Sequence, residues 1–226
     1  MPRVIVFDLM GTLLDFGALD PYFERFFGDA AVRKEWFMQT LQLAMAAVLT
    51  NTYEDFGVQA DTGLEMTARQ YKVSMLGEEK NLILNTLRKL RPYPEVAQSL
   101  QRLRDTGLRL ATLTNSTAQA AKAQLTYAGL RDHFEQVISA DEIHCFKPAP
   151  EVYHLAARRL SVETGQMRLV TAHHWDVTGA LRAGCSAAFV NRPGQVMNPF
   201  GPQPDMRGAD LGEVAEQLLA VEFGQG

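Results

Sequence analysis

The sequence lacks the features of a disulfide-bonded, membrane-spanning or nucleic-acid-binding protein. It has only two cysteines, Cys145 and Cys185, without Cys-x-x-Cys spacing or a nearby histidine pair, so we expect reduced thiols rather than a disulfide or a zinc site. Before Asp8 the chain carries one arginine and a four-residue apolar run, which is far too short for a signal peptide or a membrane span. The net charge of -4 and the pI near 5.8 give no positive surface for nucleic acid or an anionic membrane. We therefore expect a cytoplasmic protein with neither nucleic acid nor membrane as a partner.

The chain has enough apolar residues for a large core, and their spacing divides it into two parts. Its 226 residues, 46% of them apolar, suit one large domain or a domain with an insertion. From about Asp15 to Arg91 apolar residues recur at three- and four-residue intervals, which is typical of helices, until Pro92 and Pro94 end the pattern. The sequence thus predicts a helical cap over residues 15–92, inserted into a core domain of residues 1–14 and 93–226. The recurring residues are Val32, Trp36, Phe37, Leu41, Ala44, Ala47 and Val48.

After the cap, short apolar strands alternate with helices. Such alternation predicts an α/β fold with a Rossmann-like parallel sheet and helices on both of its faces. The segment 192–207, rich in proline and glycine, is expected to be a loop. Strands are expected at residues 110–113, 136–139, 169–171 and 187–190, and helices at 95–106, 117–127, 151–160, 177–183 and 211–221.

The most informative segment is the apolar run 4–7, which ends at Asp8. The run predicts a strand buried on both faces, and ligand sites form at the ends of such strands in open α/β sheets. Gly11 supplies the freedom for a turn, and Thr12 can hydrogen-bond locally. Taken alone, this pattern favours an aspartate that caps a loop. Its position and three later motifs favour a nucleophile instead.

Each of those motifs follows or ends an apolar stretch. They are Leu113-Thr114-Asn115-Ser116, Lys147-Pro148, and the segment from Val170 to Asp176. With Asp8 they resemble, in order and spacing, the four motifs of the haloacid dehalogenase superfamily. The resemblance covers nearly the whole chain and is closest to the 2-haloacid dehalogenase branch, which the segment from Lys147 to Tyr153 and the pair Trp175-Asp176 fit well.

Two positions separate this chain from the phosphate-transferring members of that superfamily. Those members carry a second aspartate two places after the nucleophile, where this chain has Met10, and a metal-binding carboxylate in the fourth motif, where it has Ala172. Methionine cannot protonate a departing alkoxide, and magnesium needs protein carboxylates. A halide leaves without protonation, so the two losses fit displacement at a carbon–halogen bond without a metal or other cofactor.

The resemblance implies a reaction in two steps. Asp8 would attack the α-carbon of a 2-halo carboxylic acid and form an ester, which water then cleaves at the acyl carbon. Lys147 would hold Asp8 ionised, and Asp176 would activate the water. From the residues alone, Lys147 could also be a solvated loop lysine and Asp176 a helix cap.

The remaining predicted site residues would bind or orient. The resemblance implies that Thr114 and Asn115 hold the substrate carboxylate, and that Thr12 and Thr171 orient carboxylates through their hydroxyl groups. Tyr153 would reach the same network, although it could equally be a core aromatic residue. The expected substrate pocket also includes Leu9, Met10, Phe37 and His173.

Three positions depart from the dehalogenase pattern. Met10 stands where that branch has a tyrosine, Phe37 where it has a cap arginine, and His173 where it has an asparagine. A buried anion without a cation is unfavourable, so a protonated His173, Arg33 or Lys34 would have to replace the arginine. The rival interpretations are a magnesium-dependent phosphatase and a small-acid-binding protein without turnover, and the sequence leaves a homodimer open.

Overall fold

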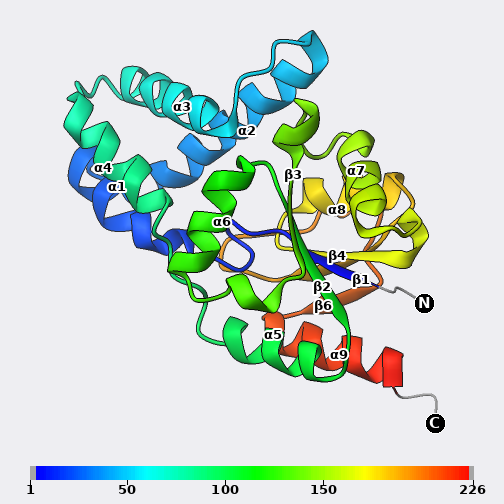
Figure 1. Ribbon diagram of the computed structural model, residues 1–226. Helices are drawn as coiled ribbons and strands as arrows, with labels where there is room; N and C mark the ends of the chain where they lie inside the picture. The colour runs from blue at the N-terminus through cyan, green and yellow to red at the C-terminus, as the bar shows by residue number, and fades with distance from the viewer. Residues whose placement is uncertain (1–3, 224–226) are drawn as a thin grey trace.

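The structure is a computed structural model that describes residues 4–223, and its centre is a sheet of six parallel strands (Figure 1). The strand order is β3-β2-β1-β4-β5-β6, so β1 lies inside the sheet with β2 and β4 on either side. The ends of β2 and β4 lie beside the end of β1, because Phe7 pairs in register with Thr112 of β2 and with Val170 of β4. The strands are β1 (Val4–Phe7), β2 (Arg109–Thr114), β3 (Gln136–Ser139), β4 (Met167–Thr171), β5 (Ser186–Val190) and β6 (Met206–Gly208).

The strand β1 is apolar throughout because helices cover both faces of the sheet. Ile5 and Phe7 share a hydrophobic cluster with residues of α5, α6 and α9, whereas Val4 and Val6 share another with residues of α7 and α8. Side chains of a strand alternate between the two faces, so each face receives two of these four residues. The predicted α/β fold with a parallel sheet is confirmed. The helices are α5 (Val96–Asp105), α6 (Ala118–Tyr127), α7 (Pro150–Leu160), α8 (His174–Arg182) and α9 (Leu211–Phe223).

The inserted helices follow β1 and lie together to one side of the sheet (Figure 1). The two longest pack along each other, with the Trp36 indole donating a hydrogen bond to the carbonyl of Ala60 over 2.9 Å. A Cβ atom at Gly63 would lie 2.7 Å from Thr40 Oγ1, so this close approach depends on glycine. The inserted helices are α1 (Asp20–Phe27), α2 (Val32–Thr50), α3 (Phe56–Gln70) and α4 (Gly77–Leu87).

The two connections between the sheet and the inserted helices run side by side. The amide of Asp15 donates to the carbonyl of Arg91 over 2.8 Å, and the amide of Tyr93 donates to the carbonyl of Leu13 over 3.0 Å. The last inserted helix, α4, ends at Leu87, so Pro92 and Pro94 lie in the connection that follows it and do not themselves end the helix.

Two elements differ from the prediction. The expected loop 192–207 ends in β6, which is too short to show an alternating pattern and forms by pairing with β5. The helix expected at 177–183 begins at His174, so Asp176 lies in its first turn and does not cap it. Over residues 4–223, none of the helices combines the length and the apolar composition that crossing a membrane requires.

Candidate active site

The carboxyl ends of β1, β2 and β4 bring the predicted polar residues to one edge of the sheet. Asp8 directly follows β1, Thr114 ends β2 and Thr171 ends β4. Asp176 comes from the first turn of α8, and Lys147 from the loop just before α7. Parallel strands present their carboxyl ends at the same edge, which is where ligands bind in open α/β sheets.

The ammonium group of Lys147 joins the two aspartates. Its Nζ donates to Asp8 Oδ1 over 2.8 Å, to Asp176 Oδ2 over 2.7 Å and to the carbonyl of Leu113 over 3.0 Å. These three bonds use every proton of the ammonium group, and only 1% of the lysine is exposed. Asn115 fixes the lysine backbone, since its Oδ1 accepts from the amide of Lys147 over 2.8 Å. Lys147 is therefore part of a buried network and not a solvated loop lysine.

The three charged groups have shifted protonation equilibria. Burial raises the pKa of Asp8, but the charge of Lys147 and hydrogen bonds from Lys147 and Thr12 outweigh it, so this pKa is lowered. Burial and the charge of Asp8 raise the pKa of Asp176, and Lys147 compensates only in part. Burial lowers the pKa of Lys147, but the charges of Asp176 and Asp8 outweigh this and raise it. Asp8 is thus held ionised, and Asp176 is the more basic carboxylate of the two.

Of the two threonines predicted to orient carboxylates, only Thr12 does so. Its hydroxyl donates to Asp8 Oδ2 over 2.6 Å and accepts from the amide of Ala172 over 3.0 Å. The hydroxyl of Thr171 accepts from the amide of His173 over 3.1 Å, and in the part of the chain that the structure describes no hydrogen bond joins it to a carboxylate. The sequence places both threonines near the ends of predicted strands, but it does not show in which direction each hydroxyl group points.

Tyr153 reaches the network through Asp176. Its hydroxyl donates to Asp176 Oδ1 over 2.6 Å and lies 3.2 Å from the backbone carbonyl of the same residue. The contact needs a glycine, since a Cβ atom at Gly179 would lie 2.4 Å from the tyrosine hydroxyl and 2.7 Å from the carbonyl of Pro148. Gly179 was not predicted as a site residue, because the sequence of its helix does not show that the hydroxyl of Tyr153 lies against it.

A small cavity of about 20 Å³ opens onto this network. That space is enough for about one water molecule, so the site is closed in this conformation. Leu9, Tyr153 and Thr171 do not line the cavity; the side chain of Leu9 is buried in the core. Leu41 and Phe56, which the sequence analysis did not assign to the site, do line it. The lining residues are Asp8, Met10, Phe37, Leu41, Phe56, Thr114, Asn115, Lys147, His173 and Trp175.

His173 is the only cation-forming side chain in this lining besides Lys147. Its Nε2 lies 2.8 Å from the carbonyl of Met10 and 3.5 Å from Asp8 Oδ2. A carbonyl only accepts, so Nε2 carries a proton. The imidazole stacks on Trp175 with ring centres 5.1 Å apart, and its centre lies 5.8 Å from that of Phe37.

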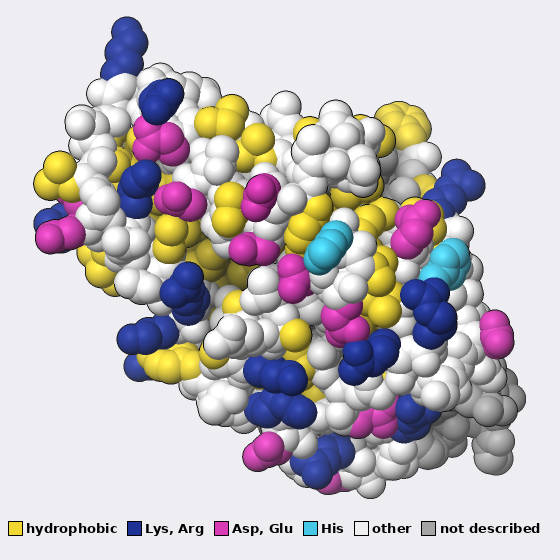
Figure 2. Space-filling view, turned by 45° about the horizontal axis from the view of Figure 1, so that its top comes forward, with side chains coloured by type: hydrophobic (Ala, Val, Ile, Leu, Met, Phe, Trp, Pro, Cys, Tyr) yellow, Lys and Arg dark blue, Asp and Glu magenta, His cyan; other side chains and the backbone are white. Residues whose placement is uncertain are grey.

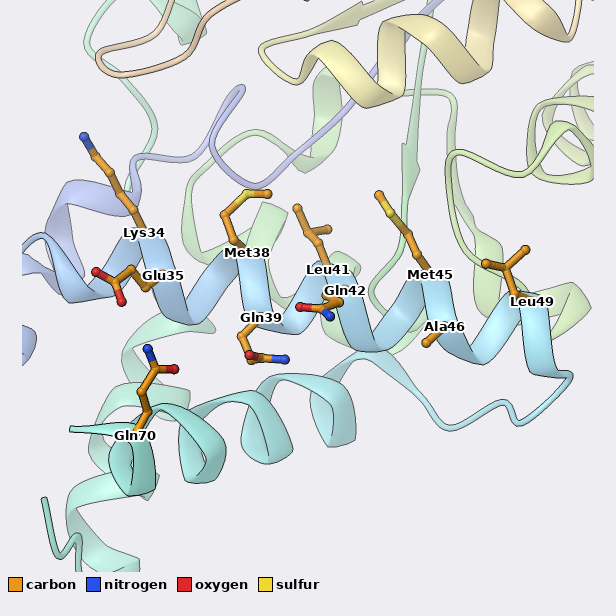
Figure 3. Close-up of a pocket in the computed structure, with 10 residues that line it drawn as sticks. All are labelled: Lys34, Glu35, Met38, Gln39, Leu41, Gln42, Met45, Ala46, Leu49 and Gln70. Atoms are coloured by element: carbon orange, nitrogen blue, oxygen red, sulfur yellow. The ribbon is translucent and has the colours of Figure 1, made fainter. Parts of the chain in front are cut away.

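The cap cations named as replacements for the missing arginine do not line the cavity. Arg33 forms an ion pair with Asp20. Lys34 lines a larger pocket of about 660 Å³ along α2, together with apolar residues such as Met38 and Met45, whose side chains point away from α3 in Figure 3. Leu41 lines both this pocket and the cavity. Another pocket of about 500 Å³ lies between α3, α4 and α6, and Phe56 lines both it and the cavity. Figure 2 shows hydrophobic side chains in the hollow between two lobes of the molecule.

The oxygen atoms around Asp8 do not fit a magnesium ion. Both carboxylate oxygens of Asp8 accept from Lys147 or Thr12, and both of Asp176 accept from Lys147 or Tyr153. The carbonyl of Met10 is bonded to His173. Within residues 4–223, no three histidine, cysteine, aspartate or glutamate side chains group as metal ligands. Magnesium requires several free oxygen ligands, which these residues do not supply.

Comparison with known families agrees with this site, in which a buried lysine lies between two aspartates at the strand ends. A family model described as haloacid dehalogenase-like hydrolase matches residues 2–184, and the chain belongs to this family. More particularly, it is similar to the (S)-2-haloacid dehalogenase of Pseudomonas sp. (strain YL), with 30% identity over 94% of this chain and 92% of that protein. The resemblance drawn from the four motifs is confirmed.

The chain is also similar to a haloacetate dehalogenase and to a solved L-2-haloacid dehalogenase. Haloacetate dehalogenase H-2 of Moraxella sp. (strain B) is 28% identical over 90% of this chain and 92% of its own length. The solved L-2-haloacid dehalogenase from Xanthobacter autotrophicus with chloropropionic acid covalently bound has a TM-score of 0.89 and 25% identity, covering 96% of this chain and 98% of that one. The chain is thus an (S)-2-haloacid dehalogenase-like hydrolase.

Proposed function

We propose that the protein hydrolyses small 2-halo carboxylic acids to 2-hydroxy acids, without a metal, through an ester on Asp8. The observation that carries this proposal is the buried Lys147 between Asp8 and Asp176, together with Met10 two residues after the nucleophile. A buried ammonium group that keeps a carboxylate ionised suits a nucleophile. The names of the relatives support the same substrate class.

In the first step, a carboxylate oxygen of Asp8 attacks the α-carbon from the face opposite the halogen. A carbon–oxygen bond forms while the carbon–halogen bond breaks, and the halide leaves with the bonding electrons. In the second step, Asp176 takes a proton from water as the water attacks the acyl carbon of the ester. The bond between the acyl carbon and the substrate oxygen breaks, and Asp176 returns its proton to the departing alkoxide, which leaves as the 2-hydroxy acid. The carboxyl group of Asp8 then loses its proton to solvent, which restores the carboxylate.

The other residues of the network position these groups. Thr12 holds one oxygen of Asp8, and Tyr153 holds one oxygen of Asp176. Thr114 and Asn115 line the cavity and are proposed to bind the substrate carboxylate. His173 is proposed to supply, when protonated, the positive charge that the cap lacks at Phe37.

We also propose that residues 15–92 act as a cap domain on a core domain of residues 1–14 and 93–226. Phe37, Leu41 and Phe56 come from the inserted helices and close the cavity over Asp8. A substrate does not fit into about 20 Å³, so binding requires these helices to move relative to the sheet. The adjoining connections at Asp15 and Tyr93 are where such a movement would take place.

The proposal predicts halide release that does not depend on a divalent metal. Wild-type protein is incubated with a panel of 2-halo acids, with and without EDTA, and free halide is measured. We expect equal rates, because Met10 and Ala172 supply no carboxylate ligand and the ammonium group of Lys147 already lies between Asp8 and Asp176. Magnesium-dependent release of phosphate from an aryl phosphate would instead support the phosphatase interpretation, and binding of the acids without turnover would support the binding-protein interpretation.

A second prediction concerns Phe37. Its ring lies 4.7 Å from that of Phe16, centre to centre, and forms an apolar wall of the cavity. We expect wild-type protein to prefer longer 2-haloalkanoates to haloacetate, and Phe37→Arg to lower KM for haloacetate roughly tenfold by adding a cation for the bound anion. Met38→Arg is the control, since Met38 is exposed and lines the 660 Å³ pocket along α2 but not the cavity. Preference for haloacetate in the wild type, with no gain in Phe37→Arg, contradicts this prediction.

A further inference from the structure

Arg192 is a buried arginine outside the network described above. It lies two residues after β5, at the start of the segment expected to be a loop, yet only 5% of it is exposed. Its Nε donates to the carbonyl of Thr12 over 3.0 Å, and its Nη1 lies 2.7 Å from Glu95 Oε1. The guanidinium carbon lies 3.7 Å from the centre of the Tyr93 ring. One side chain thus contacts both the turn after β1 and the segment that follows the inserted helices.

The contact with Thr12 connects Arg192 to the proposed nucleophile. Thr12 is held at both ends, because its carbonyl accepts from Arg192 while its hydroxyl donates to Asp8 Oδ2 over 2.6 Å. A shift of the Thr12 backbone would move this hydroxyl away from Asp8. Small displacements of a group that orients a nucleophile reduce the rate of reaction.

The other two contacts connect Arg192 to the returning end of the inserted helices. Tyr93 is paired through its backbone amide with Leu13, and Glu95 directly precedes α5. The arginine therefore lies across both connections between the sheet and the inserted helices. Its Nη2 is buried and has no hydrogen-bond partner among the residues that the structure describes.

We propose that Arg192 is a positioning residue for the dehalogenation reaction, acting through Thr12 on Asp8 and tying the Thr12 turn to the Tyr93 connection. This inference rests on the function proposed above. Arg192 does not line the cavity, so it acts on the nucleophile through Thr12 and not on the substrate.

The first test separates kcat from KM in Arg192→Lys. Lysine keeps the charge but loses the planar group that contacts Thr12, Glu95 and Tyr93 together. We expect kcat for halide release to fall roughly tenfold with little change in KM, the effect of losing one orienting hydrogen bond. Arg168→Lys is the matched control: Arg168 is 3% exposed, pairs with Asp205 and lies near the opposite end of β4, and its replacement leaves kcat unchanged.

The second test is a double-mutant cycle with Thr12→Val, which removes the hydroxyl. If Arg192 acts through that hydroxyl, Arg192→Lys lowers kcat in the wild type but has almost no further effect in Thr12→Val. Equal effects in both backgrounds, a change in KM alone, or no effect overturns the inference. If Arg192→Lys does not fold, Glu95→Gln is used in the same cycle. This substitution weakens the ion pair that positions the guanidinium group of Arg192.

The outcomes also distinguish this inference from the proposed function. Absence of halide release by the wild type with every 2-halo acid contradicts the proposed function, and the role of Arg192 in that reaction falls with it. Wild-type turnover with an additive cycle contradicts the role of Arg192 alone.

Discussion

Asp8→Asn is expected to reduce halide release roughly 10⁴-fold or more, the usual cost of removing a nucleophile. An amide does not form the ester, and it also removes the negative charge that Lys147 contacts over 2.8 Å. The measurement is halide release under single-turnover conditions, on freshly prepared protein so that deamidation does not restore the aspartate. Asp61→Asn on α3 is the control, because the side chain of Asp61 is half-exposed, faces Lys80 and lies outside the cavity lining.

Oxygen labelling tests the same residue without a substitution. With excess wild-type protein in H₂¹⁸O, the first turnover should place the heavy oxygen in the carboxylate of Asp8. The released hydroxy acid then carries an unlabelled oxygen from the side chain. Mass spectrometry of the peptide that contains Asp8 shows whether its carboxylate carries the heavy oxygen. Label in the first-turnover product, with none in Asp8, would show that Asp8 is a base and not the nucleophile.

Lys147→Met is expected to remove activity and to destabilise the fold by about 3 kcal/mol, since it leaves Asp8 and Asp176 buried without their shared cation. In the wild type the pKa of Asp8 is lowered, so the first step, which kcat/KM reports, persists to acidic pH and is lost only as the pH falls through that lowered pKa. The pKa of Asp176 is raised, so kcat, which includes the step that uses Asp176 as a base, is lost at a higher pH. Without Lys147 the pKa of Asp8 rises, and the acidic limb of any residual activity moves to higher pH.

Two measurements check this prediction: thermal unfolding, and the pH profile of kcat/KM. Lys122→Met is the matched control, because Lys122 lies on the exposed side of α6. An unchanged acidic limb in Lys147→Met, with activity near that of the wild type, would show that the lysine does not hold Asp8 ionised.

The sequence was sufficient to predict the sheet and the order of its motifs. Strands buried on both faces leave a continuous apolar pattern, so the run before Asp8 and the alternation after Pro92 were both informative. The contact of Lys147 with Asp8 also followed from the resemblance, whereas its contact with Asp176 is known only from the structure.

Contacts between distant segments were not predictable in the same way. Nothing near Thr171 in the sequence shows that its hydroxyl accepts from the next turn. Phe56 looks like any apolar residue at the start of a helix, and Arg192 looks like any arginine in a loop. Their positions depend on packing between elements that are far apart in the chain, which local patterns do not encode.

The size of the cavity bears on which molecules can intercept the ester. A space of about 20 Å³ holds one water molecule, but an alcohol or an amine with several heavy atoms needs more room. In the proposed reaction, an alcohol or amine that attacked the acyl carbon in place of water would release the hydroxy acid but leave Asp8 itself modified, so helices that closed again over the ester and admitted only water would protect the nucleophile. The closed helices would thus determine the chemical fate of the ester as well as access to it.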